Sequence, residues 1–364
     1  MKITIIKELE ALYPLKDEWN RLVKDAADAS LFQTWEWCVS WFETYGTPGS
    51  LFVILGWEEG ALVAIAPLIL TTKRILFRNQ KVLSFLGADN KFSDYCSIIS
   101  SKDSPQHLTC LLQWIIKENK EWQVLDLRNM QDQSTQARLI AEQFRINGYF
   151  TTSRYQSDAP CINLQTVEAK DLPKRKSLKR HFNWFDKNGS LEIMFATTAQ
   201  DVGPHLPDFF AQHQKRWANT TSPSLFKDSR SREFFQLLTK KLDGTPWLHF
   251  TKISHDNQPI AYHFGFTFKD SFIWYKPSFD PALAKKSPGE VLLKSLFEYS
   301  LGKGMSKFDF TVGNEGFKYR FADTINRITH LQIFKSRTNF IIAKGIVRAR
   351  SVKHMCLATR NKSA

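Results

Sequence analysis

The stretch Phe272–Phe321 decides the fold, and it reads FIWYKPSFDPALAKKSPGEVLLKSLFEYSLGKGMSKFDFTVGNEGFKYRF. Its first residues, Phe272–Lys276, are rich in aromatic side chains and predict a strand. Pro288–Leu301 has apolar residues at helical spacing, and Gly302 follows, so we expect a helix that ends there. Phe308–Thr311 predicts a second strand. The segment is therefore expected to form a strand, a polar loop, a helix and another strand.

The loop before this helix has the residues of a phosphate-binding helix start. A helix N-terminus presents free N–H groups and the positive end of a dipole, which suit a phosphate. Ser287 is the expected N-cap and Pro288 the first helical residue. Gly289 allows a ligand to approach the backbone closely, and Lys285 and Lys286 add positive charge. Ordinary helix capping explains the same residues, so the loop alone leaves both interpretations open.

The order of predicted elements repeats along the chain. In the second half, Trp247–Ser254 and Ile260–Phe268 form a predicted hairpin ahead of the strand, helix and strand described above. In the first half, Leu51–Trp57 and Ala61–Thr72 form another. The other elements expected in the first half are helices at Asp17–Asp28, Thr34–Tyr45, Leu108–Lys117 and Thr135–Ile146, and strands at Val82–Leu86, Tyr95–Ile99 and Trp122–Leu127. We therefore predict an α+β fold with mixed sheets, built from two similar halves.

A basic amphipathic helix is predicted between the two halves, over Leu172–Gly189. Pro173 suits its first position and Gly189 its end. Its apolar face carries Leu178, Phe182 and Phe185. The other face is occupied by Lys and Arg residues, which either remain in solvent or contact a substrate.

Composition narrows the class of protein. The chain has 364 residues, of which 43% are hydrophobic, enough for two cores. It has no apolar run of membrane-helix length, no signal-peptide pattern and five scattered Cys, which together favour a cytoplasmic location. The net charge of +14 predicts an anionic partner or a solvated basic surface. Residues 337–364 are expected to form a basic amphipathic tail on an anionic membrane or on RNA, or else a solvated terminus.

Several enzyme classes are excluded by the motifs that the sequence lacks. It contains no GxxxxGK phosphate loop, no GxGxxG after a strand, no GxSxG elbow and no HExxH. The nine His residues are scattered singly, so no metal site is predicted.

Short motifs, taken in order, resemble those of GNAT-type acyltransferases in the CelD-like and FemAB-like double-domain group. They are Phe32–Trp37, Leu83–Gly87, Asp94-Tyr95, the basic segment Lys174–Gly189, Trp274-Tyr275, Asp280, Ser287-Pro288-Gly289, Asp309-Phe310 and Gly313–Phe321. One departure is Asn314–Phe317, where the CelD-like pattern more often has Asp-Glu-Pro-Tyr, and it bears on the acceptor more than on the fold. The resemblance implies GNAT-like halves at 1–165 and 191–336, joined by the basic helix at 166–190 and followed by the tail at 337–364.

The chemistry of acyl transfer, the reaction that the resemblance implies, suggests roles for individual residues. As donor the resemblance implies acyl-CoA such as acetyl-CoA, bound at Lys285, Lys286, Ser287, Pro288 and Gly289. The catalytic candidates are Lys318 for the oxyanion or a donor phosphate, Asp309 to orient Lys318 or the nucleophile, His263 as base and Tyr275 to protonate the leaving thiolate. Candidate substrate-binding residues are Trp35, Trp37, Asp280, Glu315 and Arg320. Each has an ordinary structural alternative: a surface lysine, a turn-capping aspartate, a buried histidine or a packed aromatic ring.

Three functions are consistent with these features. The first is acyl-CoA-dependent transfer to an amine or hydroxyl in cell-envelope or surface-polysaccharide assembly, with an anionic glycan precursor as an acceptor. The second is a FemAB-like peptidyltransferase that uses aminoacyl-tRNA, which the positive charge favours. The third is a nucleic-acid- or membrane-binding protein on a degenerate transferase fold.

The expected helix start gives a first prediction. A Gly289→Val variant should lose donor binding because its branched side chain blocks close approach to the backbone. A Lys285→Ala/Lys286→Ala double variant should weaken donor binding less, because it removes only exposed charge. Calorimetric titration with the acyl donor measures both effects. Wild-type affinity in both variants would place the donor elsewhere.

Overall fold

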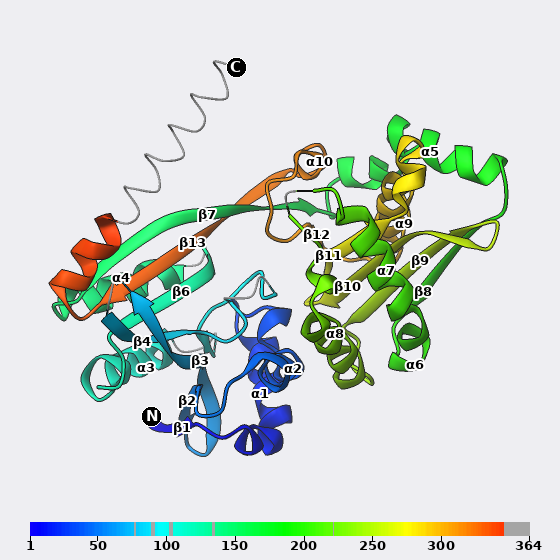
Figure 1. The fold of residues 1–364 in the computed structure, drawn as a ribbon. Helices are drawn as coiled ribbons and strands as arrows, with labels where there is room; N and C mark the ends of the chain where they lie inside the picture. The colour runs from blue at the N-terminus through cyan, green and yellow to red at the C-terminus, as the bar shows by residue number, and fades with distance from the viewer. Residues whose placement is uncertain (76–77, 89–91, 102–104, 133–134, 221, 346–364) are drawn as a thin grey trace. The chain divides into compact units, whose positions relative to one another are not determined.

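The structure of the protein is a computed structural model, which describes residues 1–75, 78–88, 92–101, 105–132, 135–220 and 222–345. The chain divides into two units (Figure 1). Unit 1 comprises Met1–Ala29, Pro48–Gln156 and the described chain from Thr329 onward. Unit 2 comprises Ser30–Thr47 and Ser157–Ile328. Each unit therefore combines segments that are far apart in the sequence.

Unit 1 is a mixed sheet with helices. Its strands are β1 (Lys2–Ile6), β2 (Leu51–Glu58), β3 (Ala61–Ile75), β4 (Arg78–Phe85), β5 (Ile99–Ser100) and β6 (Val124–Gln131). Its helices are η1 (Leu9–Leu15), α1 (Lys16–Asp25), α3 (Pro105–Lys117) and α4 (Thr135–Ile146). Two long strands, β7 (Phe150–Asn163) and β13 (Thr324–Phe334), have one end in each unit. The strand order is β1-β2-β3-β4-β6-β13-β7, and β5 pairs with β3. The β4/β6 pair is parallel.

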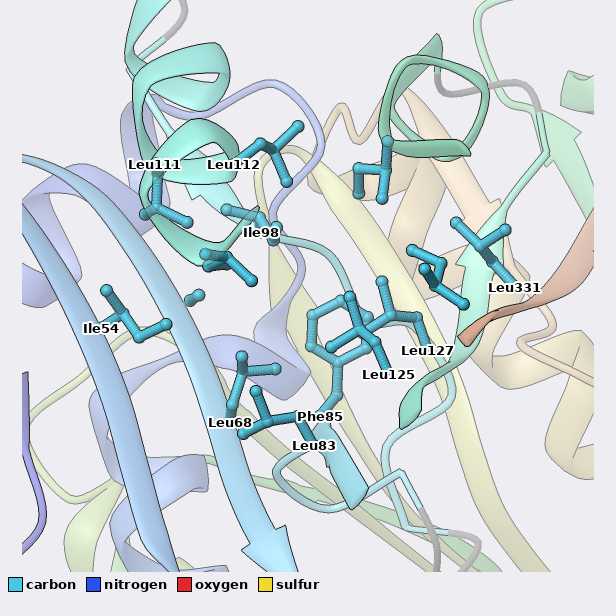
Figure 2. Close-up of a cluster of buried hydrophobic side chains, with 14 of the residues drawn as sticks. Ile54, Leu68, Leu83, Phe85, Ile98, Leu111, Leu112, Leu125, Leu127 and Leu331 are labelled. Carbon is cyan, nitrogen blue, oxygen red and sulfur yellow. The ribbon is translucent and has the colours of Figure 1, made fainter. Parts of the chain in front are cut away.

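The core of unit 1 lies between this sheet and α3 and α4. Figure 2 shows Leu125 and Leu127 of β6 beside Leu331 of β13, with Leu111 and Leu112 of α3 across from the sheet. Side chains along a strand alternate between the two faces of a sheet, so the odd-numbered residues of β6 and β13 supply this apolar layer. Burial of each such Leu contributes about 1.5–3 kcal/mol of hydrophobic stabilisation.

The even-numbered residues of the same strands form a polar network within unit 1. The Asp126 carboxylate of β6 accepts a hydrogen bond from His330 Nε2 and another, at 2.9 Å, from Gln332 Nε2 of β13. Arg154 of β7 donates to His330 Nδ1. Because Nδ1 accepts, the imidazole proton lies on Nε2. These contacts fix β13 between β6 and β7.

Unit 2 contains a second set of strands and helices. Its strands are β8 (Leu191–Ala196), β9 (Leu248–His255), β10 (Gln258–Phe268), β11 (Ser271–Phe279) and β12 (Lys307–Asp309). Its α-helices are α2 (Trp35–Tyr45), α5 (Lys176–Lys187), α6 (Ala199–Val202), α7 (Leu206–Trp217), α8 (Ser229–Lys241), α9 (Pro288–Gly302) and α10 (Gly316–Tyr319). Short 3-10 helices are η2 (Leu31–Gln33), η3 (Glu168–Lys174), η4 (Gly203–His205), η5 (Leu225–Lys227) and η6 (Pro281–Lys286). The strand order is β7-β12-β11-β10-β9-β8, and β11/β12 is the parallel pair.

Helices α7 and α9 cover opposite faces of this sheet. On α7, Phe209 contacts Tyr262 and Phe264 of β10. Ala261 and His263 alternate with Tyr262 and Phe264 along β10, so they face the other side of the sheet. Ala261 belongs to the core cluster that contains Leu292 of α9. Helix α5 packs beside α9.

The mixed α+β fold, both hairpins and the helix Thr135–Ile146 are confirmed. Two local predictions are wrong. Tyr95–Ile99 is not a strand, since only Ile99 of that run belongs to β5. The basic helix does not begin at Pro173, which lies in η3. Arg175 has an extended ψ of 136° that separates η3 from α5. The predicted apolar face is present, with Leu178 and Phe185 buried and Phe182 partly buried.

Part of the predicted tail lies within the described residues. Residues 337–345 are helical, and Phe340 packs on Phe150 and Phe334, whereas Ile341 is exposed. The remainder of the predicted basic tail, 346–364, lies outside the described residues. Among the helices that the structure describes, none has both the length and the apolar character that crossing a bilayer requires.

A β-bulge at Gly265 shapes the centre of the unit 2 sheet. The β10/β11 register shifts between Phe264 and Phe266. The His263 imidazole lies over Gly265 and leaves no room for a side chain there. A Cβ on Gly265 would overlap this ring and lie 2.6 Å from Ile273 O.

This packing gives a stability prediction. A Gly265→Ala variant should lose about 1–3 kcal/mol of unfolding free energy, because the His263 ring and the backbone of β11 must both shift. The matched control is Gly302→Ala in the last turn of α9, where an added Cβ meets no atom within 4 Å. That control should be neutral or stabilising by up to about 1 kcal/mol. Urea denaturation measures both, and equal stability of the two variants would contradict the packing described.

Candidate functional site

The site begins where the parallel strands of unit 2 separate. Strand β11 pairs with β12 only from Ser271↔Lys307 to Ile273↔Asp309, and then continues to Phe279 without β12. Thr311 has a left-handed φ of 57°, and its hydroxyl donates to Trp274 O at 3.0 Å. The chain after β12 thus turns away from β11. The separation leaves the edge of β11 open beside the start of α9.

A cavity of about 210 Å³ occupies this opening. Its apolar lining residues are Trp274, Pro277, Phe279, Ala284, Leu292, Leu293 and Phe317. Its other lining residues are Arg216, Ser278, Ser287, Gly289, Glu290 and Arg320. A small apolar cavity with a few convergent polar groups is typical of ligand sites.

The start of α9 forms one wall of the cavity. Ser287 occupies the N-cap position, but its backbone is left-handed, with φ 56°, and its side chain makes no capping bond. A Cβ on Gly289 would meet only the Phe279 ring, at 3.5 and 3.8 Å. Pro288 is the first helical residue, as predicted. Neither Lys285, which is exposed, nor Lys286, whose Nζ lies 4.1 Å from the Trp184 ring centroid, lines the cavity.

Glu290, in the first turn of α9, brings a carboxylate into the cavity wall. Its Oε1 accepts from Arg320 Nη2 at 2.7 Å. Its Oε2 is buried without a hydrogen-bond partner among the described residues, and His181 Nε2 lies 3.9 Å from it. Arg320 was predicted from the sequence, whereas Glu290 was not. The sequence feature that could have identified Glu290 is its position directly after Ser287-Pro288-Gly289.

Two further residues of the cavity were not predicted, Arg216 of α7 and Ser278 of β11. Arg216 Nη1 donates to Pro277 O at 3.0 Å, and its guanidinium carbon lies 4.1 Å from the Phe279 ring centroid. Burial lowers the pKa of Arg216 to about 10, against a smaller opposing effect of Glu315. Ser278 is fully buried, and its hydroxyl has no partner among the described residues.

Lys318 and Asp309 stabilise the loop that follows β12. Lys318 is 3% exposed, and its Nζ donates to Val312 O at 3.1 Å and pairs with Glu315 at 3.0 Å. Asp309 pairs with Lys307 at 2.9 Å and accepts from Thr311 N at 2.8 Å. The negative charge of Asp309 raises the pKa of Lys307. Lys318, Glu315 and Asp309 are not among the residues that line the cavity.

His263 and Tyr275 are held in the sheet. His263 is fully buried, and its Nε2 accepts from the backbone N–H of Tyr275 at 3.1 Å. Burial holds its pKa well below the usual range. A neutral imidazole whose basic nitrogen is already bonded is poorly placed to act as a base. The Tyr275 ring is also buried, against Trp37 and Phe235.

The other predicted substrate residues lie apart from the cavity lining. Trp37 is fully buried against Phe234 and Phe266, and Trp35 is 8% exposed beneath Lys241. Asp280 pairs with Lys215 at 2.9 Å and caps η6 by accepting from Ala282 N. Within the described chain, no cluster of three or more His, Cys, Asp or Glu could hold a metal ion.

Residues 173–319 match the family model of the acetyltransferase (GNAT) domain, a range that contains all of the cavity lining except Arg320. No curated protein sequence matches the chain. In fold the chain is similar to FemX, with a TM-score of 0.63 and 8% identity over 91% of this chain and 97% of that one.

Two further solved structures share the fold. One is the C-terminal domain of a putative lysylphosphatidylglycerol synthetase from Agrobacterium fabrum, with a TM-score of 0.56 and 10% identity over 92% of this chain and 95% of that one. The other is L-PGS from Bacillus licheniformis, with a TM-score of 0.52 and 10% identity over 93% and 96%. The GNAT-type domain and the FemAB-like fold expected from the sequence are confirmed.

The contacts of Lys318 predict an effect on stability. Lys318→Ala should lower the free energy of unfolding by about 1–3 kcal/mol, because it leaves the Val312 carbonyl and the Glu315 carboxylate without their donor. Lys285→Ala, a change at an exposed lysine of the same unit, should stay within about 0.5 kcal/mol of wild type. Chemical denaturation distinguishes the two. A Lys318→Ala variant as stable as wild type would show that the lysine does not hold the loop.

Proposed function

We propose, on the basis of the GNAT-type acyltransferase domain in residues 173–319, that this chain transfers an acyl group from an activated donor to an amine or hydroxyl in cell-envelope assembly. The observation that carries the proposal is the cavity at the open edge of β11, bounded by a helix start. The acyl group would enter this cavity, with the activated end of the donor beside Ser287 and Gly289. A cytoplasmic location, with the basic tail at an anionic membrane surface, is part of the proposal.

The chemistry needs a proton acceptor for the nucleophile and donors for the tetrahedral oxyanion. Glu290 Oε2 has free acceptor capacity at the cavity wall, so it is the proposed acceptor for the proton of an amine or hydroxyl. Ser278 is the proposed neutral donor to the oxyanion, since its hydroxyl has no protein partner among the described residues. The carbonyl–nucleophile bond forms as the nucleophile loses its proton, and the bond to the leaving thiolate or alkoxide then breaks.

Acyl-CoA is the first candidate donor. The family model describes an acetyltransferase domain, and the start of α9 presents the Gly289 backbone to the cavity. The CoA phosphates would meet this helix start, with Lys285 and Lys286 contributing charge at longer range.

An aminoacyl ester of tRNA is the second candidate donor, and Glu290 favours it. A carboxylate in the first turn of α9 repels a phosphate at that position but suits the ammonium group of an aminoacyl chain. Helix α5, which packs beside α9, adds a positive surface for a polyanion through Lys176, Lys179 and Arg180. A binding protein without turnover remains the third candidate.

A binding panel separates these donors. Thermal shift with CoA, acetyl-CoA, a long-chain acyl-CoA and charged tRNA should show which ligand stabilises the folded chain. A tRNA donor should lose affinity steeply between about 50 and 200 mM salt, by about a thousandfold or more if it makes six or more phosphate contacts. Binding of none of these ligands would contradict the proposed function.

The Glu290 carboxylate gives a matched test of donor class. Glu290→Gln should weaken charged tRNA about tenfold or more if the carboxylate binds the ammonium group, because charged hydrogen bonds contribute about 1.5–3 kcal/mol. For an acyl-CoA donor the same change should leave binding intact and lower kcat. The control is Glu298→Gln on the same helix, where the carboxylate pairs with Lys294. Unchanged binding and unchanged kcat in Glu290→Gln would exclude both roles.

A further inference from the structure

Arg216 is a cation that forms no ion pair with a carboxylate among the described residues. Only Nη1 of its guanidinium has a protein acceptor, the Pro277 carbonyl, among the described residues. The guanidinium carbon lies over the Phe279 ring, 4.1 Å from its centroid, and over the Trp217 ring, 5.3 Å from its centroid. A guanidinium has five N–H donors, and a partly buried charge without a partner is costly. This cation therefore has unused capacity to bind an anion.

The nearby carboxylates are engaged with other cations. Glu315, which influences the pKa of Arg216, is paired with Lys318 Nζ at 3.0 Å. Asp280 is paired with Lys215 at 2.9 Å. Glu290 is paired with Arg320 at 2.7 Å. No ion pair to Arg216 is present in the described part of the chain, so the guanidinium has donors left to bind an anionic ligand.

Arg216 reaches the cavity from the face of the sheet opposite α9. It lies in the last turn of α7, the helix that covers the Tyr262 and Phe264 face of β10. The proposed donor site is at the start of α9, on the other face. Ser278 lies opposite Tyr262 of β10 and lines the cavity, and among the described residues its hydroxyl has no hydrogen-bond partner. The preceding residue is Pro277, whose carbonyl accepts a hydrogen bond from Arg216. The cavity is thus reached from both faces, with one set of binding groups on each.

We infer that Arg216 binds an anionic group of the acceptor, a phosphate or carboxylate, and so places the acceptor's amine or hydroxyl against the acyl group held at α9. This inference rests on the proposed function, because it assigns the second substrate of the same site. The planar guanidinium fork matches the two oxygens of either group, and its contacts with the Phe279 and Trp217 rings limit its movement. The acceptor class is therefore an anionic amine or alcohol.

Calorimetric titration with two probes, inorganic phosphate and acetate, tests the anion site directly. Arg216→Gln should weaken the preferred probe about tenfold or more, the loss expected for charge-assisted hydrogen bonds. Arg216→Lys should recover part of the affinity, since it keeps the charge but not the fork. The control is Lys215→Gln, which removes a neighbouring positive charge that is tied to Asp280, and it should stay within about twofold. The probe that binds more tightly shows whether the anionic group of the acceptor is a phosphate or a carboxylate.

A second experiment tests whether Arg216 binds the acceptor and not the donor. The donor found in the panel above should bind Arg216→Gln as it binds wild type, and the probe should bind with that donor already present. Probe affinity that is unchanged in both Arg216 variants would overturn the inference, and so would competition between probe and donor. If no donor binds wild type, the proposed function fails while the probe titration still decides the anion site.

Discussion

The short pairing of β11 with β12 is the constraint on which the site depends. Parallel strands that stayed paired to their ends would satisfy each other's backbone groups and leave no space between them. Here the pairing stops at Ile273 and Asp309, and the Thr311 hydroxyl takes over at the Trp274 carbonyl. The buried contacts of Asp309 and Lys318 keep the following loop turned away. The cavity is the space that this separation leaves, and α9 begins beside it.

Local signals in the sequence were enough for many of the helices and strands, but not for the contacts between them. Ser287-Pro288-Gly289 could be placed at a helix start because capping depends on neighbouring residues, and these residues do line or border the cavity. Arg216 lies in a helix that the sequence pattern did not predict, and only the tertiary fold brings it to Phe279. Lys318 could not be recognised as buried, because the sequence does not show which way a lysine points in a loop. Small neighbours suggested space beside His263, but the imidazole itself occupies the space over Gly265.

The cations near the cavity differ in whether they already have a partner within the protein. Much of the positive charge near the cavity is already used: Lys215 on Asp280, Lys318 on Glu315, Arg320 on Glu290, and Lys286 on the face of Trp184. A net charge of +14 by itself does not say where an anion binds. The partners and the burial of each cation indicate where an anion can bind, because a cation with a carboxylate beside it gains little from a second anion. By this criterion Arg216 differs from Lys215, Lys318 and Arg320, each of which is paired with a carboxylate.

The position of β13 in unit 1 also constrains the order in which the chain can fold during synthesis. This strand lies between β6 and β7, and Asp126 is joined to His330 across the β6/β13 boundary. Its unit 1 residues, from Thr329 onward, leave the ribosome after all of unit 2 has been made. Until then β6 and β7 are without the strand that separates them, and their backbone groups are open to incorrect pairing. The N-terminal unit is therefore the last to be completed, and a truncation before Thr329 should damage the first half of the chain more than the second.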